Sequence, residues 1–210
     1  MLTLLSFVGD FIVIGESAVK VFRHWPKLQS HYDQKSYTCT ATYHRHTGEH
    51  VLGPVPLKTT TGKPMLREDL QRMLEDAVNR ENIPVKYNCK VEGYFESAGE
   101  GGVILADGRR FTAQVVAACD GVQSRSREIM SNEIKEPVNS GHAVYRASAP
   151  MKELFKRDPA LEKVFGCSPS EPYLRWFSGP DCHGIVFSDG ETVCWSIHHP
   201  VSLSINTVYA

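Results

Sequence analysis

The sequence has almost no net charge, no long apolar run and no repeated or low-complexity segment. Its 23 lysine and arginine residues are balanced by 24 aspartate and glutamate residues, which leaves a formal net charge of −1. A chain without excess basic charge has no electrostatic basis for binding nucleic acid or an acidic lipid surface. We therefore expect no nucleic-acid partner and find no firm indication of a membrane partner. The oligomeric state stays open.

The chain also lacks the cysteine spacing of a metal site. Its six cysteines contain no C-x-x-C pair and no clustered His/Cys arrangement, which is how zinc sites are recognised in a sequence. We expect that the chain binds no metal and that its thiols stay reduced. The apolar residues 1–8 have no basic residue before them and are too short to span a bilayer. The absence of a targeting signal indicates the cytoplasm.

What the sequence does contain is an Asp-Gly pair in an unusual setting. Two other Asp-Gly pairs, at residues 107–108 and 189–190, lie between strand-like runs and predict hairpin turns. Asp120 and Gly121 instead follow the apolar residues 115–119, which we expect to form a strand, and precede small and cationic residues that suit a helix start. Free backbone N–H groups at a helix start favour an anion. This pattern predicts phosphate or flavin chemistry.

The motif D-G-x-x-S-x-x-R at residues 120–127 resembles the "DG" segment of the FAD-dependent aromatic-ring hydroxylases, the para-hydroxybenzoate and salicylate hydroxylase type of flavoprotein monooxygenase. Three more segments resemble parts of that family in the family's order. Residues 66–70 resemble its arginine-bearing helix, residues 103–116 a meander leading to the DG strand, and residues 141–146 the first strand of its substrate-binding sheet.

This resemblance implies a mixed α/β (α+β) fold. Residues 1–140 would form an incomplete FAD-binding, Rossmann-like domain, and residues 141–210 part of a β-rich substrate-binding domain. The family's opening strand and G-x-G-x-x-G loop, which approaches the pyrophosphate of FAD, has no counterpart in the sequence. The later Gly-Asp flavin segment has none either. We therefore expect a member that is truncated at both ends.

In function, the resemblance implies an FAD-dependent monooxygenase that hydroxylates an aromatic or polyketide-like small molecule with NAD(P)H and O₂. Related flavin epoxidases and reductases form a weaker possibility. The alternative is a catalytically inactive remnant with little or no FAD binding. Because the pyrophosphate loop is absent from the sequence, we expect the isolated 210 residues to bind FAD poorly or not at all.

Arg67 is the first candidate cofactor-binding residue. It lies on the flank of the apolar face of the helix predicted at residues 65–80, and a cation is disfavoured in a first helical turn. An anionic partner would explain it, and in the family this position contacts the flavin cofactor. The alternative is an arginine that pairs with a nearby carboxylate.

The other cofactor candidates are Asp120, Gly121 and Val91. In the family the aspartate faces the ribityl and pyrophosphate region, although Asp120 could equally be a helix N-cap. Gly121 would allow close backbone approach. The position of Val91 resembles that of the strand residue that contacts adenine in the family. The alternative is that Val91 packs in the protein core, as a strand valine ordinarily does.

The second half suggests a substrate pocket at Tyr145 and Arg146. A group of four aromatic residues could line this pocket, although the cores of sheets are often rich in aromatic residues. The four residues are Tyr173, Trp176, Phe177 and Trp195. We interpret His183, His198 and His199 as structural because no partner spacing connects them. No catalytic residue and no triad is identified.

Overall fold

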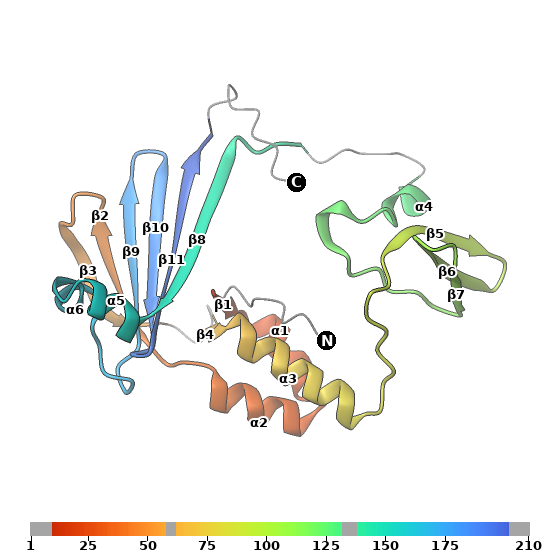
Figure 1. Ribbon diagram of the computed structural model, residues 1–210, viewed down its shortest axis with the longest axis horizontal. Helices are drawn as coiled ribbons and strands as arrows, with labels where there is room; N and C mark the ends of the chain where they lie inside the picture. The colour runs from red at the N-terminus through yellow and green to blue at the C-terminus, as the bar shows by residue number, and fades with distance from the viewer. Residues whose placement is uncertain (1–9, 58–61, 132–137, 202–210) are drawn as a thin grey trace. The chain divides into compact units, whose positions relative to one another are not determined.

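The computed structural model describes residues 10–57, 62–131 and 138–201 (Figure 1). The chain groups into two compact units, one with residues 1–83 and 141–210 and the other with residues 84–140. One limit of the units lies at residue 141, and the residues before 84 group with the later segment. The assignment of residues 1–140 to cofactor binding and 141–210 to substrate binding concerns function and stays a prediction.

A six-stranded sheet dominates the first unit (Figure 1), with strand order β3-β2-β9-β10-β11-β8. β2 runs parallel to β9, and the other neighbouring pairs are antiparallel. The strands are β2 (Thr40–Arg45), β3 (His50–Pro56), β8 (His142–Pro150), β9 (Tyr173–Gly179), β10 (Cys182–Ser188) and β11 (Thr192–Pro200). The pairing of β2 with β9 is the physical reason why early and late residues share one unit.

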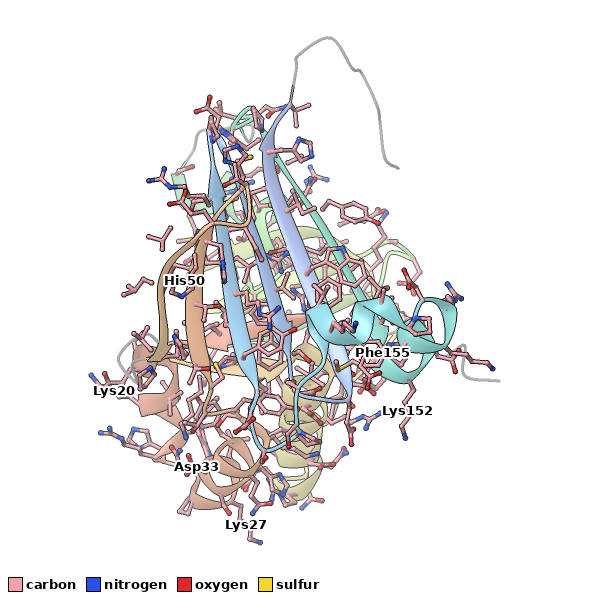
Figure 2. All side chains as sticks on the ribbon, turned by 90° about the vertical axis from the view of Figure 1, so that its left-hand side faces the viewer. Lys20, Lys27, Asp33, His50, Lys152 and Phe155 are labelled. Atoms are coloured by element: carbon pink, nitrogen blue, oxygen red, sulfur yellow. The ribbon has the colours of Figure 1, made fainter. Side chains whose placement is uncertain are left out.

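The two faces of this sheet are covered by different elements. On the helix face, the hydroxyl of Tyr173 donates to the carbonyl of Phe165 in α6 at 2.9 Å. Figure 2 shows α5, which carries Phe155, in front of the strands. On the opposite face, the β1 face, the ring centroid of Phe187 lies 4.9 Å from that of Phe11. The elements named here are α5 (Met151–Arg157), α6 (Ala160–Phe165) and β1 (Phe11–Ile14).

Three helices and a two-stranded ladder complete the first unit. β1 pairs with β4 (Lys63–Leu66) in antiparallel register. The helices are α1 (Glu16–Phe22), α2 (Pro26–Lys35) and α3 (Arg67–Arg80). Proline at the first position of α2 suits a helix start because the missing N–H would be unsatisfied there. The helices and β4 share a buried core of Leu28, Tyr32, Met65 and Met73.

The second unit is a three-stranded antiparallel meander followed by two short helices. The elements are β5 (Val91–Ser97), β6 (Glu100–Leu105), β7 (Arg110–Ala113), the 3₁₀ helix η2 (Gly121–Gln123) and α4 (Arg127–Ser131). Gly102 in the central strand is packed so closely that a Cβ would lie 2.2 Å from the Phe95 ring. The meander therefore has no room there for a side chain.

Most of the expected elements are confirmed. The Asp-Gly pairs at residues 107–108 and 189–190 form the turns of the β6–β7 and β10–β11 hairpins, and their glycines have φ of 83° and 88°.

Among the described residues, no helix is long and apolar enough to cross a bilayer. None of the six cysteines, all of which lie in described segments, forms a disulfide.

Two expected elements were wrong in part or whole. Residues 115–119 are not a strand, and Val115 is 83% exposed. A strand requires a hydrogen-bonded neighbour, and residues 115–119 have none within the described chain. The helix predicted at 65–80 begins at Arg67 because residues 65 and 66 belong to β4.

Candidate functional site

Arg67 is held at the junction of β4 and α3 by Asp10. The register pairs Phe11 with Leu66, so Asp10 and Arg67 are the next residues beyond that end of the ladder. The backbone N–H of Arg67 donates to the carbonyl of Asp10 at 2.9 Å, and Arg67 Nε lies 2.9 Å from Asp10 Oδ1. The carboxylate partner considered in the sequence analysis is therefore present. The Arg67 side chain is nevertheless 57% exposed, which leaves donor groups for a ligand.

Arg146 reaches the same carboxylate from β8. Its Nη1 donates to Asp10 Oδ2 at 2.8 Å. Asp10 is 7% exposed, so two guanidinium groups share one buried carboxylate. Arg67 and Arg146, which the sequence assigned to separate sites, are thus joined. Sequence reasoning missed Asp10, and its only signal was a charged residue directly before an apolar strand.

Tyr145 and Arg146 point to opposite faces of the sheet, because side chains alternate along a strand. Arg146 pairs with Ser196, Ser196 with Ile185 and Ile185 with Trp176, so Trp176 shares the β1 face with Arg146. Tyr145 lies on the helix face. That face also carries Tyr173, Phe177 and Trp195 from the aromatic group. A single pocket lined by the whole aromatic group is therefore not formed.

Three rings stack across neighbouring strands on the β1 face. The Trp176 and His183 centroids are 5.0 Å apart with planes at 7°, and the His183 and His198 centroids are 4.1 Å apart with planes at 16°. Desolvation, followed by the nearby His183 and Arg146, lowers the pKa of His198 below its ordinary value. This environment favours the neutral form of the His198 imidazole. Only the strand register brings these residues together, so their sequence spacing gave no signal.

The helix face carries an apolar cavity of about 450 Å³. Leu154 of α5 and Phe165 of α6 line it together with residues of β10 and β11, including Val186 and Trp195. Its lining contains neither Arg67, Asp10 nor Arg146. This cavity is therefore distinct from the ion cluster on the opposite face.

In the second unit, Asp120 is fixed by Tyr94 of β5. The Tyr94 hydroxyl donates to Asp120 Oδ2 at 2.7 Å. Hydrogen bonding from Ser124, and next from Tyr94, holds the pKa of Asp120 below its usual value. Asp120 precedes η2 but makes no side-chain capping hydrogen bond to it. Its carboxylate is exposed and ionised rather than used as a helix cap.

Gly121 and Val91 lie in the same unit. Gly121 has a φ of 81°, and a Cβ at that position would meet no atom within 4 Å. Its backbone is thus open to a ligand on the side where a side chain would stand. Val91 opens β5 opposite Leu105 and is partly buried. Its expected contact with adenine stays a prediction.

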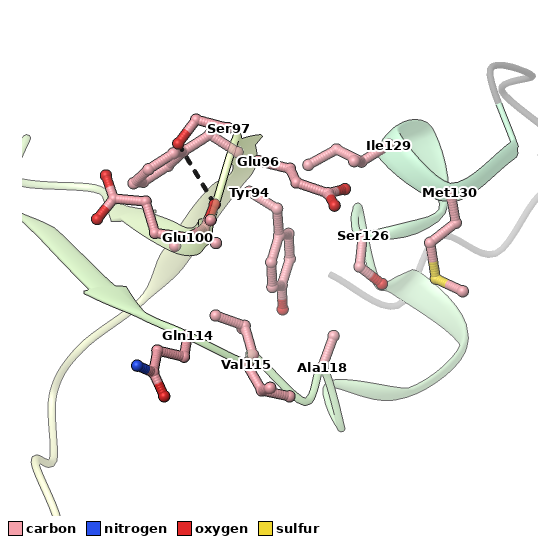
Figure 3. Close-up of a pocket in the computed structure, with 15 residues that line it drawn as sticks. Tyr94, Glu96, Ser97, Glu100, Gln114, Val115, Ala118, Ser126, Ile129 and Met130 are labelled. Carbon is pink, nitrogen blue, oxygen red and sulfur yellow. Dashed lines mark hydrogen bonds between the residues drawn. The ribbon is translucent and has the colours of Figure 1, made fainter.

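A cavity of about 640 Å³ lies beside this segment. Figure 3 shows the Tyr94 ring among Val115, Ala118 and Ser126. Ile129 and Met130 of α4 also line it. The residues expected to form a strand at 115–119 therefore contribute apolar wall to a hollow. Within the described ranges of the chain, no three His, Cys, Asp or Glu side chains gather as metal ligands.

Comparison with known proteins relates the sequence to FAD-dependent monooxygenases. No protein-family model matches the chain. The FAD-dependent monooxygenase AacuC of Aspergillus aculeatus is 35% identical over 91% of this chain and 40% of its own length. The FAD-dependent monooxygenase fsr3 of Gibberella fujikuroi is 30% identical over 92% of this chain and 40% of its own length. The chain is homologous to part of the FAD-dependent monooxygenases. It spans about 40% of the length of these curated relatives.

A solved structure agrees at the level of the fold. The crystal structure of CtdE in complex with FAD has a TM-score of 0.79 and 24% identity, and the match covers 96% of this chain and 51% of CtdE. The mixed α/β fold expected from the sequence is confirmed as part of this flavoprotein fold. The roles of Arg67, Asp120, Gly121, Val91, Tyr145 and Arg146 stay predictions.

Proposed function

We propose that this chain acts as an FAD-dependent monooxygenase, or as the corresponding part of one. The observation that carries the proposal is the 35% identity to a FAD-dependent monooxygenase over 91% of the chain. Such an enzyme hydroxylates an aromatic or polyketide-like small molecule with NAD(P)H and O₂. The solved structure of CtdE in complex with FAD and a substrate supports a small-molecule substrate. The cytoplasm is the proposed location.

Taken one by one, the proposed cofactor residues carry groups that suit parts of an FAD molecule. Arg67 offers exposed guanidinium N–H groups to an oxyanion, and Gly121 offers a backbone that no side chain blocks. Asp120, kept ionised by its hydrogen bonds, can accept hydrogen bonds from ribityl hydroxyls. When bound, FAD supplies the redox chemistry and the activation of oxygen. Arg67, Asp120, Gly121 and Val91 are the residues that we propose hold it.

The protein's own part in the reaction is to position the substrate and exclude water. Arg146 and the Trp176–His183–His198 stack share the β1 face of the sheet. A planar substrate can stack against such rings, and the remaining N–H groups of Arg146 can orient a polar substituent. We assign Tyr145 to the opposite face and therefore prefer Arg146 as the substrate-side residue.

The test is FAD-dependent oxidation of NAD(P)H by the purified protein with excess FAD and isotopically labelled oxygen. We expect oxidation that requires added FAD, and label in a hydroxylated product when a panel of aromatic and polyketide-like compounds is supplied. Protein that stays colourless and never oxidises NAD(P)H would support the inactive remnant instead. NADH and NADPH compared side by side identify the preferred reductant.

Matched variants make the test specific. Arg67→Gln removes the proposed cofactor contact, whereas Arg72→Gln removes an arginine of the same helix that pairs with Glu68. Asp120→Asn is matched by Asp107→Asn, an Asp-Gly aspartate in an ordinary hairpin. Loss of activity in Arg67→Gln and Asp120→Asn, with retention in both controls, is the expected pattern. Equal loss in all four variants would contradict the proposed site.

A further inference from the structure

The carboxylate of Asp10 is enclosed, while both of its arginine partners open to solvent. The Asp10 side chain is 11% exposed, against 57% for Arg67 and 43% for Arg146. Arg67 begins α3 and Arg146 belongs to β8, so the carboxylate connects the helical layer to the sheet. Burying a lone carboxylate is costly unless cations pair with it. The two guanidinium groups meet that requirement.

The Asp10 carboxylate cannot accept hydrogen bonds from all the N–H groups of the two arginines. Each guanidinium has five N–H groups, and in the described part of the chain Asp10 is the side-chain partner found for either of them. The cluster of Asp10, Arg67 and Arg146 carries a net charge of +1, with several N–H groups directed elsewhere. This charge and donor surplus suits an oxyanion such as a phosphate, a pyrophosphate or a carboxylate.

Asp10 does not hold the two arginines equally firmly. Arg146 makes a hydrogen bond to Oδ2 at 2.8 Å. Oδ1 is buried and, among the described residues, has the Arg67 Nε at 2.9 Å as an ion-pair partner but makes no hydrogen bond. The Arg67 guanidinium is therefore the easier of the two to reorient. An anion that draws it away would leave Oδ1 without a cation and change the charge that faces Arg146.

We propose that Asp10 is a positioning residue shared by Arg67 and Arg146, and that it couples oxyanion binding at Arg67 to the hydrogen bonding of Arg146. Asp10 acts through the two arginines and does not contact the ligand. In terms of the proposed function, on which the cofactor assignment of Arg67 rests, occupancy on the cofactor side changes the arginine on the substrate side. Such coupling is reciprocal by thermodynamic necessity.

The experiment follows the Nε–H NMR signals of both arginines during titration with inorganic pyrophosphate and, separately, with benzoate. Arg67→Lys and Arg146→Lys assign the signals. In the wild type we expect the Arg67 and Arg146 signals to move together with one apparent affinity. In Asp10→Asn the Arg146 response disappears, and pyrophosphate affinity rises about fivefold or more because the carboxylate no longer competes for the Arg67 guanidinium. Asp10→Glu restores the joint response.

Asp69→Asn is the matched control, because Asp69 is also an ion-paired carboxylate, with Lys35 at 3.4 Å, in the first turn of α3. It should leave the joint response intact. A stronger effect of pyrophosphate identifies a cofactor-like oxyanion, and a stronger effect of benzoate identifies a substrate-like one. If Asp10→Asn does not fold, Arg146→Gln takes its place and should change the affinity of Arg67 for pyrophosphate.

Four results would overturn the proposal. These are a wild type that binds neither anion, no joint movement in the wild type, an unchanged Arg146 response in Asp10→Asn, and equal loss of that response in Asp69→Asn. The proposed function is judged separately by FAD-dependent NAD(P)H oxidation. Joint movement without that activity would support the coupling and contradict the proposed monooxygenase function.

Discussion

At the scale of single residues, the sequence identified the arginines but not the carboxylate that holds them. Arg67 could be selected because its place in the first turn of a helix disfavours a cation, and the structure supplies Asp10 as the compensating partner. The joining of Arg146 to the same group depends on the register of β8 and on the packing of β1 against the sheet. Neither can be deduced from residue spacing alone.

Tyr94→Phe should raise the pKa of Asp120. The substitution removes the hydrogen bond donated to Oδ2 at 2.7 Å, which favours the ionised form. Hydrogen bonding from Ser124 remains, so the pKa should still lie below the ordinary value for aspartate. NMR titration of the carboxyl carbon measures the change. Asp107, whose low pKa depends on Arg109, should titrate as before, and an unchanged Asp120 would contradict the assigned role of Tyr94.

His198 should titrate below the ordinary histidine pKa, and His183→Ala should move it upward. Desolvation is the main cause of the low pKa and the charge of His183 adds to it. Because the folded state then binds fewer protons than the unfolded state, stability contributed by the neutral ring is lost as pH falls below the ordinary histidine pKa. NMR titration of the imidazole signals is the measurement. A His198 pKa above the ordinary value would contradict the stacked, neutral arrangement.

At the scale of elements, hairpins were easier to predict than isolated segments. Asp-Gly at residues 107–108 and 189–190 specifies a tight turn locally, and both hairpins are present. Residues 115–119 have the apolar composition of a strand, yet pairing depends on a neighbour elsewhere in space. Composition could not reveal that the described chain provides none. The short β4 strand before Arg67 was missed for the same reason, since β1 is its partner.

Gly102→Ala should destabilise the meander of the second unit. A Cβ there would lie 2.2 Å from the Phe95 ring and 2.5 Å from the carbonyl oxygen of Phe111. Relieving such overpacking costs about 1–3 kcal/mol. Gly93→Ala in the neighbouring strand is the control, because its nearest contact is Ile104 at 3.8 Å. Denaturant unfolding compares them, and equal stability of the two variants would show that the strand packing is wrong.

At the scale of the whole molecule, the order of segments carried the family resemblance while the grouping of the units did not follow from it. The homology covers 91% of this chain and 40% of AacuC, so segment order along the sequence was a sound guide to the fold. The sheet, however, takes β2 and β3 from before residue 84. A long-range parallel pair such as β2–β9 leaves no local signal in either strand.

The central proposal is that Arg67 and Asp120 each contribute to FAD binding, and FAD titration monitored by flavin fluorescence tests it most directly. We predict weak binding by the wild type, with affinity lowered about tenfold or more in Arg67→Gln and in Asp120→Asn, since each loses a charged hydrogen-bonding group. Arg72→Gln and Asp107→Asn should bind as the wild type does. Equal FAD affinity in the wild type and in all four variants would contradict the account.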